Sequence, residues 1–138
     1  MIMEKKLPRG IRNCNPGNIR ITRDKWQGLR SVQTDKSFFQ FVEMKWGYRA
    51  LLRTLQNYRR RHGCRTIEDF ISRWAPPQDN NNTAAYIRRV CLDLQVPQTY
   101  TPDIDDKETM CAFAAAISRV ENGQPAVMAD VEAGWDLL

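Results

Sequence analysis

The sequence contains a single histidine, His62, and few groups suited to holding a metal ion. Its four cysteines show no C-x-x-C spacing, whereas structural zinc sites need four Cys or His ligands that usually come in close pairs. We therefore expect no metal and no other cofactor. A cysteine nucleophile activated by histidine is also disfavoured, because the only histidine lies in a basic stretch.

The sequence also lacks a long apolar run and a secretion signal. No stretch approaches the roughly 20 apolar residues that a membrane-spanning helix needs, so we expect no membrane insertion. The first seven residues, MIMEKKL, are charged and contain no apolar region of the kind found in signal peptides. We therefore expect cytoplasmic synthesis without a signal peptide. We also find no glycine-rich loop with the spacing of a phosphate-binding motif.

Positive charge is in excess, since 21 Lys and Arg residues against 16 Asp and Glu residues give a net charge of +5. The densest cluster comprises Arg59, Arg60, Arg61 and His62, with Arg65 close behind. Such a balance favours an anionic partner, for example nucleic acid, a charged cell envelope or an acidic protein. A nucleic-acid-binding module that uses these arginines is therefore one hypothesis, and a solvated helix end is the simpler interpretation.

The chain of 138 residues has the size of one domain. We expect residues 1–9 to form a basic arm and residues 10–138 a single domain. Two short segments, 18–22 and 37–41, predict a small antiparallel β ribbon near the N-terminus. Helical spacing of apolar residues then predicts about five helices, over residues 44–62, 66–75, 84–94, from 105–108 to 122, and a short segment after 125. The expected fold class is α+β, mainly helical.

Two loops are rich in asparagine: residues 11–20 read IRNCNPGNIR and residues 78–83 read QDNNNT. Asn side chains both donate and accept, so they can hold an irregular loop in one shape. With the aromatic residues nearby, the loops predict the rims of a cleft for a polymer such as a glycan or a nucleic acid. Structural turns, a loop-capping role for Asp79 and a core position for Tyr86 are the alternatives. The expected substrate-binding residues are Asn15, Asn18, Trp26, Asp79, Asn81 and Tyr86.

Cleavage of a glycosidic bond requires a carboxyl group that donates a proton. Most acids of the chain have structural explanations at helix ends or on solvated helix faces. Glu43 is the predicted catalytic residue, because apolar neighbours such as Phe41 and Trp46 help a carboxyl group to keep its proton. The alternative is that Glu43 only complements the dipole of a helix N-terminus. The acids that remain near the expected cleft are Asp24, Asp35, Glu43 and Asp79.

Several motifs follow one another in a fixed order: R-G-I-R-N-x-N-P-G-N-I-R at 9–20, W-x-G at 26–28, F-F-x-F at 38–41, G-Y-R-A-L at 47–51, R-W-A-P-P at 73–77 and N-N-T-x-x-Y-I at 81–87. This pattern resembles a family of small phage and prophage proteins that are often labelled virion or structural protein P5 and grouped with lysozyme-like domains. The resemblance covers roughly residues 9–95. It implies a lysozyme-like fold and a peptidoglycan substrate.

A weaker similarity links the Asn-Pro-Gly-Asn-Ile-Arg loop to bacterial glucosaminidases, and residues 83–90 to the Tyr-bearing helix of lytic transglycosylases. The second similarity implies that Tyr86 faces the cleft. In those enzymes the catalytic Glu lies on a helix before the Asn/Gly loop. Here Glu4 is the sole acid before Gly10, so the usual Glu has no match. Either another acid such as Glu43 has taken over, or the domain binds without cutting.

We thus predict a peptidoglycan-binding protein of phage or prophage origin that cleaves the glycan strand as a muramidase or lytic transglycosylase. A single acid favours the lytic transglycosylase or a substrate-assisted route over hydrolysis with two carboxylates. The alternatives are a non-catalytic virion structural protein and the nucleic-acid-binding module. The expected partners are peptidoglycan glycan strands and other virion proteins, and the expected place of action is the bacterial cell wall or a phage particle.

Overall fold

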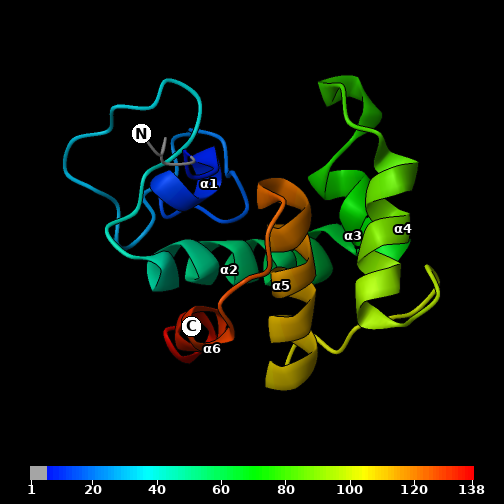
Figure 1. Ribbon diagram of the computed structural model, residues 1–138. Helices are drawn as coiled ribbons and strands as arrows, with labels where there is room; N and C mark the ends of the chain where they lie inside the picture. The colour runs from blue at the N-terminus through cyan, green and yellow to red at the C-terminus, as the bar shows by residue number, and fades with distance from the viewer. Residues whose placement is uncertain (1–5) are drawn as a thin grey trace, which may run out of the picture.

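Helices account for nearly all the regular structure of the protein. The computed structural model describes residues 6–138, and within them it contains six α-helices and one 3₁₀ helix (Figure 1). In chain order these are α1 (Arg9–Arg12), α2 (Met44–His62), α3 (Ile67–Trp74), η1 (Pro77–Asp79), α4 (Thr83–Leu94), α5 (Lys107–Asn122) and α6 (Met128–Asp136). The mainly helical part of the predicted fold is confirmed. None of these helices is both long and apolar enough to cross a membrane.

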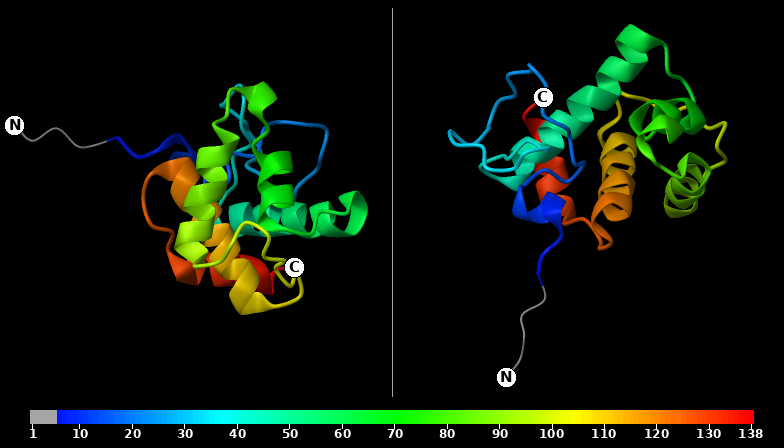
Figure 2. Two further views of the ribbon diagram at one scale, coloured as in Figure 1. Left: turned by 90° about the vertical axis from the view of Figure 1, so that its right-hand side faces the viewer. Right: turned by 90° about the horizontal axis from the view of Figure 1, so that it is seen from above.

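Helix α2 is the element against which most of the others pack. Its apolar residues recur on one face, and Tyr48, Leu51, Leu52 and Leu55 are buried there. The helix ends at Gly63, whose φ of 68° is a left-handed conformation that glycine adopts at low cost. Both α5 and α6 contact α2, with α5 crossing it (Figures 1 and 2). The remaining elements are therefore placed relative to α2.

Polar side chains fix the starts of three helices. The Thr66 hydroxyl accepts a hydrogen bond from the Asp69 backbone N–H, and the Asp69 carboxylate accepts one from Thr66, so the two form a capping box at α3. Asn82 and Asp106 cap α4 and α5 with their side-chain oxygens, which accept hydrogen bonds from the backbone N–H groups of Ala85 and Thr109. Each cap satisfies a backbone donor that the first turn leaves free, so these starts follow from local sequence.

The main core lies between α2, α3, α4, α5 and α6. The ring of Phe70 on α3 meets that of Phe113 on α5 edge-on, with centroids 5.5 Å apart. A smaller cluster around Phe39, Phe41 and Ala50 attaches the long loop of residues 13–43 to α2. This loop lies at one end of the molecule and α3 with α4 at the other, as Figure 1 shows. The helical core thus carries two separate sets of loops.

The predicted β ribbon is wrong. The described residues contain no strand and only two isolated bridges. Arg20–Phe38 joins the two segments that we expected to pair, and Leu29–Phe41 lies outside that pairing. Buried Asn15 explains the difference. Its amide nitrogen donates to the carbonyls of Ile19 and Phe39, and its oxygen accepts from the Ile19 N–H. One side chain thereby takes backbone groups that a strand ladder would need.

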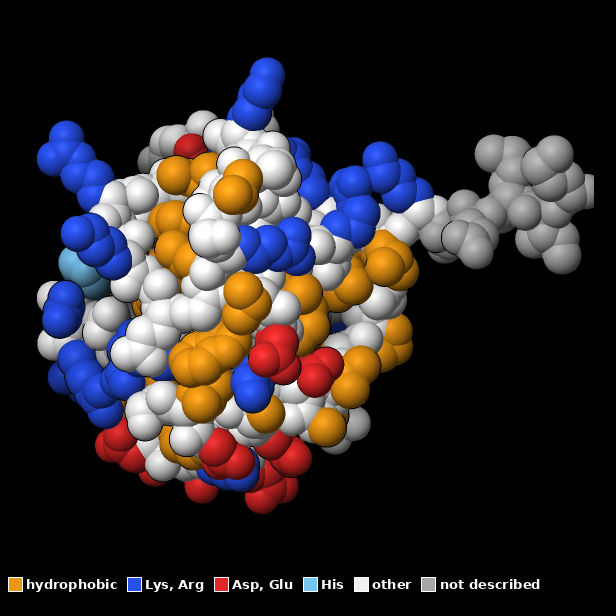
Figure 3. Space-filling model, turned by 90° about the vertical axis from the view of Figure 1, so that its left-hand side faces the viewer, with side chains coloured by type: hydrophobic (Ala, Val, Ile, Leu, Met, Phe, Trp, Pro, Cys, Tyr) orange, Lys and Arg blue, Asp and Glu red, His pale blue; other side chains and the backbone are white. Residues whose placement is uncertain are grey.

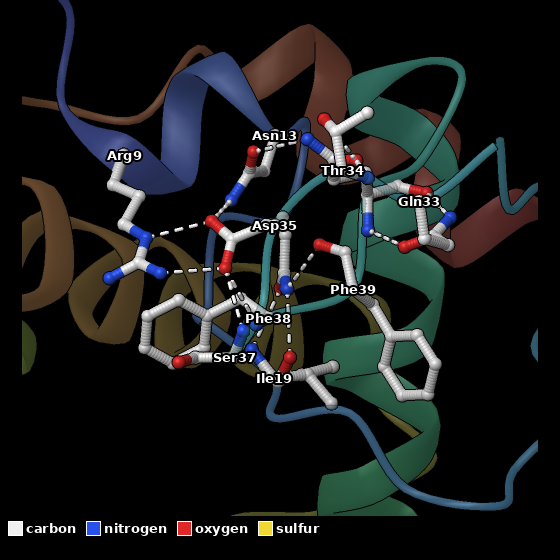
Figure 4. A network of polar contacts seen from close by, with 11 residues as sticks. Arg9, Asn13, Ile19, Gln33, Thr34, Asp35, Ser37, Phe38 and Phe39 are labelled. Atoms are coloured by element: carbon white, nitrogen blue, oxygen red, sulfur yellow. Dashed lines mark hydrogen bonds and ion pairs between the residues drawn. The ribbon is translucent and has the colours of Figure 1, made fainter.

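A second polar network, centred on Asp35, holds the same loop to the N-terminal helix. The Asp35 carboxylate accepts hydrogen bonds from the Arg9 guanidinium at 2.6 and 2.7 Å and from the Asn13 amide at 2.9 Å (Figure 4). It also accepts from the backbone N–H groups of Ser37 and Phe38. The Arg9 hydrogen bond, followed by the backbone and Asn13 hydrogen bonds, holds the pKa of Asp35 well below its usual range. Asp35 therefore has a structural role outside the cleft described below.

Arg9, the fourth residue that the structure describes, belongs to this network. Of the predicted basic arm, residues 1–5 lie outside the part of the chain that the structure describes. Arg9 is the first residue of α1 and forms the ion pair with Asp35. The predicted arm thus includes a residue that anchors the loop of residues 13–43.

Replacing Asp35 by Asn should lower the free energy of unfolding near neutral pH by about 1–3 kcal/mol, because the acceptor of four donor groups loses its charge. The pKa of Asp35 is lower in the folded than in the unfolded state. Its stabilising contribution is therefore complete above the unfolded pKa of about 3.9 and is lost as the pH falls towards the lower folded pKa. Urea unfolding at about pH 7 and about pH 3 measures both effects.

The matched control is Asp79→Asn, because the Asp79 carboxylate makes no hydrogen bond to the described residues and the residue is exposed. Its stability should stay within about 0.5 kcal/mol of the parent protein. A stability difference for Asp35→Asn that is the same at both pH values would contradict the assigned role.

Candidate functional site

Residues of the two asparagine-rich loops line one hollow of about 360 Å³. Helix α2 contributes Thr54 and Tyr58, and the end of α3 contributes Trp74. The C-terminal end of α5 contributes Glu121. The loops contribute the remaining lining residues: Gly17, Asn18, Ile19, Arg20, Thr22, Asp24, Trp26, Phe38, Ala75, Asp79 and Asn81. Aromatic rings, amides and carboxylates therefore share one cleft.

Glu121 is the carboxylate of the cleft that is most firmly oriented. One carboxylate oxygen accepts a hydrogen bond from the Asn18 amide at 3.0 Å, and the other accepts one from the Tyr86 hydroxyl at 2.8 Å. The Tyr86 oxygen in turn accepts from the Trp74 indole N–H at 3.2 Å. Glu121 is half-buried and lines the hollow. The Glu121 carboxylate is thus held in one orientation beside the hollow.

Tyr86 lies behind Glu121 rather than in the cleft. The residue is buried on α4 and is not among the lining residues. Burial first, and then the nearby Glu121 carboxylate, raise the pKa of Tyr86 far above its ordinary value. The phenol therefore stays protonated and acts as a fixed donor to Glu121.

The first asparagine-rich loop is positioned by contacts to α2 and α5. At the end of α5, the Asn122 amide donates to the carbonyl of Pro16 at 2.9 Å. At α2, Gly47 lets the loop approach closely, because a Cβ there would collide with the Cys14 carbonyl oxygen. Asn18 itself has a φ of 50°, a left-handed conformation that Asn tolerates better than most residues. These contacts bring the Asn18 amide to Glu121.

The second asparagine-rich loop is tied to the end of α3. The Thr83 hydroxyl donates to the carbonyl of Ala75 at 2.6 Å, and the Asn81 amide donates to the carbonyl of Pro76 at 3.1 Å. Asp79 and Asn81 are thereby placed along the opposite rim of the hollow from Asn18. Hydrogen bonds from side chains to backbone carbonyls thus support both rims.

The structure brings together four of the predicted substrate-binding residues, since Asn18, Trp26, Asp79 and Asn81 all line the hollow. Asn15 is fully buried and holds the backbone of its own loop. These placements agree with a cleft between the two loops, and they give Asn15 a structural role.

Glu43, the predicted catalytic residue, lies elsewhere. It precedes the first turn of α2, its side chain is 63% exposed, and its nearest cationic partner is Lys45 at 3.9 Å. It does not line the hollow. Trp46 and Phe41 belong to the small apolar cluster around Phe39 and Ala50 and do not enclose the Glu43 carboxylate.

Glu121 was missed because it was assigned to a solvated helix end. The contact that identifies it joins Asn18 and Glu121, which are 103 residues apart in the chain. A single sequence carries no sign of such a pairing. The sequence near Glu121 indicates only that a helix ends there, because Asn122 and Gly123 follow the acid. Gly123 does end α5, with a φ of 66°.

The charges around the hollow are mainly negative. Asp24, Asp79 and Glu121 line it, and Arg20 is the cation among the lining residues. The Asp24 carboxylate accepts a hydrogen bond from the Thr22 hydroxyl at 2.7 Å. Among residues 6–138, no group of three or more His, Cys, Asp or Glu side chains is arranged to hold a metal ion.

Comparisons with known proteins connect the chain to bacteriophages. No family model matches the sequence. The chain is 33% identical to Protein P5 of Pseudoalteromonas phage PM2 over 132 residues, which is 93% of this chain and 80% of the relative. The predicted resemblance to phage P5 proteins is confirmed by this match, and it extends well beyond residue 95. The chain belongs to the family of Protein P5 of phage PM2.

Proposed function

We propose that this phage-related protein binds a peptidoglycan glycan strand in the cleft and cleaves it, with Glu121 as general acid/base. The observation that carries the proposal is the position of Glu121, which lines the hollow while Asn18 and Tyr86 hold its two oxygens. A carboxyl group of fixed orientation beside the hollow supports the proposal. The proposal replaces Glu43 as the acid, because Glu43 lies outside the hollow.

The lining of the cleft favours a sugar polymer. Sugar rings present an apolar face that stacks on aromatic side chains, and Trp26, Tyr58 and Trp74 all line the hollow. Sugar hydroxyls and acetamido groups form hydrogen bonds with amides such as those of Asn18 and Asn81. A nucleic acid would instead meet three carboxylates and a single arginine, which disfavours the phosphate backbone.

Glu121 is also a candidate for the catalytic Glu that has no match before the Asn/Gly loop in this sequence. In the enzymes with the similar Asn/Gly loop, the catalytic Glu lies on a helix that precedes the loop. Here α5, far later in the chain, brings Glu121 to the Asn18 amide of that loop. An acid on a helix and an Asn/Gly loop are therefore both present in this chain, in a different order.

In this mechanism Glu121 donates a proton to the glycosidic oxygen as the bond to the leaving sugar breaks. The resulting carboxylate then takes a proton from the incoming hydroxyl group. In a lytic transglycosylase that hydroxyl belongs to the same sugar and an anhydro ring forms; in a hydrolase it belongs to water. One oriented acid is sufficient for the first route, which we favour.

The test is incubation of purified cell-wall sacculi with the protein, followed by mass spectrometry of the soluble fraction. We expect release of muropeptides that carry anhydro ends. Muropeptides with ordinary reducing ends would support cleavage by hydrolysis instead. Binding to sacculi without any release would support wall docking by a non-catalytic phage protein, and absence of both binding and release would refute the proposal.

Tyr86→Phe should lower the rate of muropeptide release by about tenfold or more, because a lost hydrogen bond to a charged group costs about 1.5–3 kcal/mol. The change removes the donor to Glu121 and the acceptor for Trp74 but leaves the ring in the core. Tyr86 is a positioning residue in this account, so kcat should fall with little change in KM. A rate equal to that of the parent protein would contradict this role.

A further inference from the structure

The cleft continues past the Glu121 hollow along the C-terminal half of α2. A second hollow of about 410 Å³ shares four lining residues with the first: Asp24, Trp26, Thr54 and Tyr58. It adds Lys25, Asn57, Arg61 and His62. Because the two hollows share walls, a single extended ligand can occupy both.

The charge changes sign along this continuous cleft. Lys25 and Arg61 are both exposed, and neither forms an ion pair with the described residues. The acid in the second hollow is Asp24, which also belongs to the first and accepts from Thr22. Lys and Arg side chains gather along the edge of the molecule that carries the histidine (Figure 3). These charges disfavour an anionic group near Glu121 and favour one beyond Tyr58.

A row of rings connects the two hollows. The Tyr58 ring lies 6.4 Å from that of Trp74 on the Glu121 side and 6.3 Å from that of His62 on the basic side. The Arg73 guanidinium lies over Tyr58 at 5.3 Å and helps to fix it. This gives the ligand an apolar surface that leads from the acidic hollow to the basic one.

We infer that the second hollow binds a carboxylate carried by the glycan strand, with Lys25 and Arg61 as its main partners. The inference rests on the proposed function and names the part of the substrate that the basic end recognises. In peptidoglycan, carboxylates come from the stem peptides or from the lactyl groups that remain when the peptides are removed. Both sources offer the same chemistry to Lys25 and Arg61.

The test measures binding of three ligands to the full chain carrying Glu121→Gln, which prevents turnover. The ligands are a neutral N-acetylglucosamine oligomer, glycan strands stripped of peptides, and strands that keep them. In this background, Lys25→Glu with Arg61→Glu should weaken binding of at least one carboxylate-bearing ligand by about fivefold or more at low salt. Binding of the neutral oligomer should not change. The ligand that loses affinity identifies the source of the carboxylate.

The matched control is Arg88→Glu, which reverses an exposed charge on α4 and should leave all three affinities unchanged. If the neutral oligomer binds and the double reversal affects no ligand selectively, the inference about the basic end is wrong while the proposed function stands. If no ligand binds at all, both the inference and the proposed function are wrong.

Discussion

Glu121→Gln should reduce the release of muropeptides from sacculi by about 100- to 10,000-fold, the usual contribution of general acid/base catalysis. Gln has the shape of Glu but cannot donate and then accept a proton at the reacting oxygen. Its amide oxygen can still accept a hydrogen bond from Asn18 or from the Tyr86 hydroxyl, so one of the two neighbours stays engaged. The fold and the binding of sacculi should therefore be preserved while turnover is lost.

Glu43→Gln is the matched control for Glu121→Gln. Glu43 is exposed at the start of α2 and does not line the hollow, so its replacement should leave the release rate unchanged. Loss of activity in Glu43→Gln together with normal activity in Glu121→Gln would reverse the assignment. Thermal unfolding of both variants checks that neither result reflects a damaged fold.

Gly47→Ala should destabilise the protein and, in the fraction that folds, displace the Asn18 loop. An added Cβ would collide with the Cys14 carbonyl oxygen and lie 2.6 Å from Cδ of Pro16, so α2 and the loop must move apart. Overpacking of this kind lowers the free energy of unfolding by about 1–3 kcal/mol. Replacing Gly by Ala inside a helix by itself raises it by about 1 kcal/mol. The backbone carbonyl has little freedom to move, so the overpacking cost should be near the upper end of its range and the net loss of stability about 2 kcal/mol.

Displacement of the loop should also reduce activity, because Asn18 would no longer hold Glu121. The comparison variant is Gly63→Ala, where an added Cβ meets nothing within 4 Å but the φ of 68° remains unfavourable. Its cost should be about 1 kcal/mol from the backbone alone, with normal activity. Chemical unfolding and muropeptide release measure the two effects separately. Equal activity in both variants would mean that the packing of Gly47 does not position the site.

The helices could be predicted because each is specified by nearby residues. The apolar face of α2, Gly63 at its end, and the capping box at Thr66 all lie within the helix or beside it. The fold prediction failed in the loop of residues 13–43, where apolar and β-branched residues suggested strands. There Asn15 and Asp35 bind backbone groups directly, and side chains of this kind compete with strand pairing.

The candidate site could be predicted only in part, for a related reason. The loops that carry Asn18 and Asn81 are recognisable from their composition, and both line the hollow. The acid that completes the site comes from α5, and its partners Asn18 and Tyr86 lie 103 and 35 residues away in sequence. Only the packing of α5 against the N-terminal loop and α4 reveals that Glu121 belongs to the cleft.

The central claim is that the cleft beside Glu121 takes a glycan strand, and NMR titration of the Glu121→Gln variant with a neutral N-acetylglucosamine oligomer tests it most directly. We predict that the backbone amide signals of Asn18, Trp26, Asn81 and residue 121 shift together as the oligomer is added. Signals of Glu43 and of the exposed face of α4 should stay in place. A titration that shifts no signals, or shifts only signals outside the two hollows, would contradict the account.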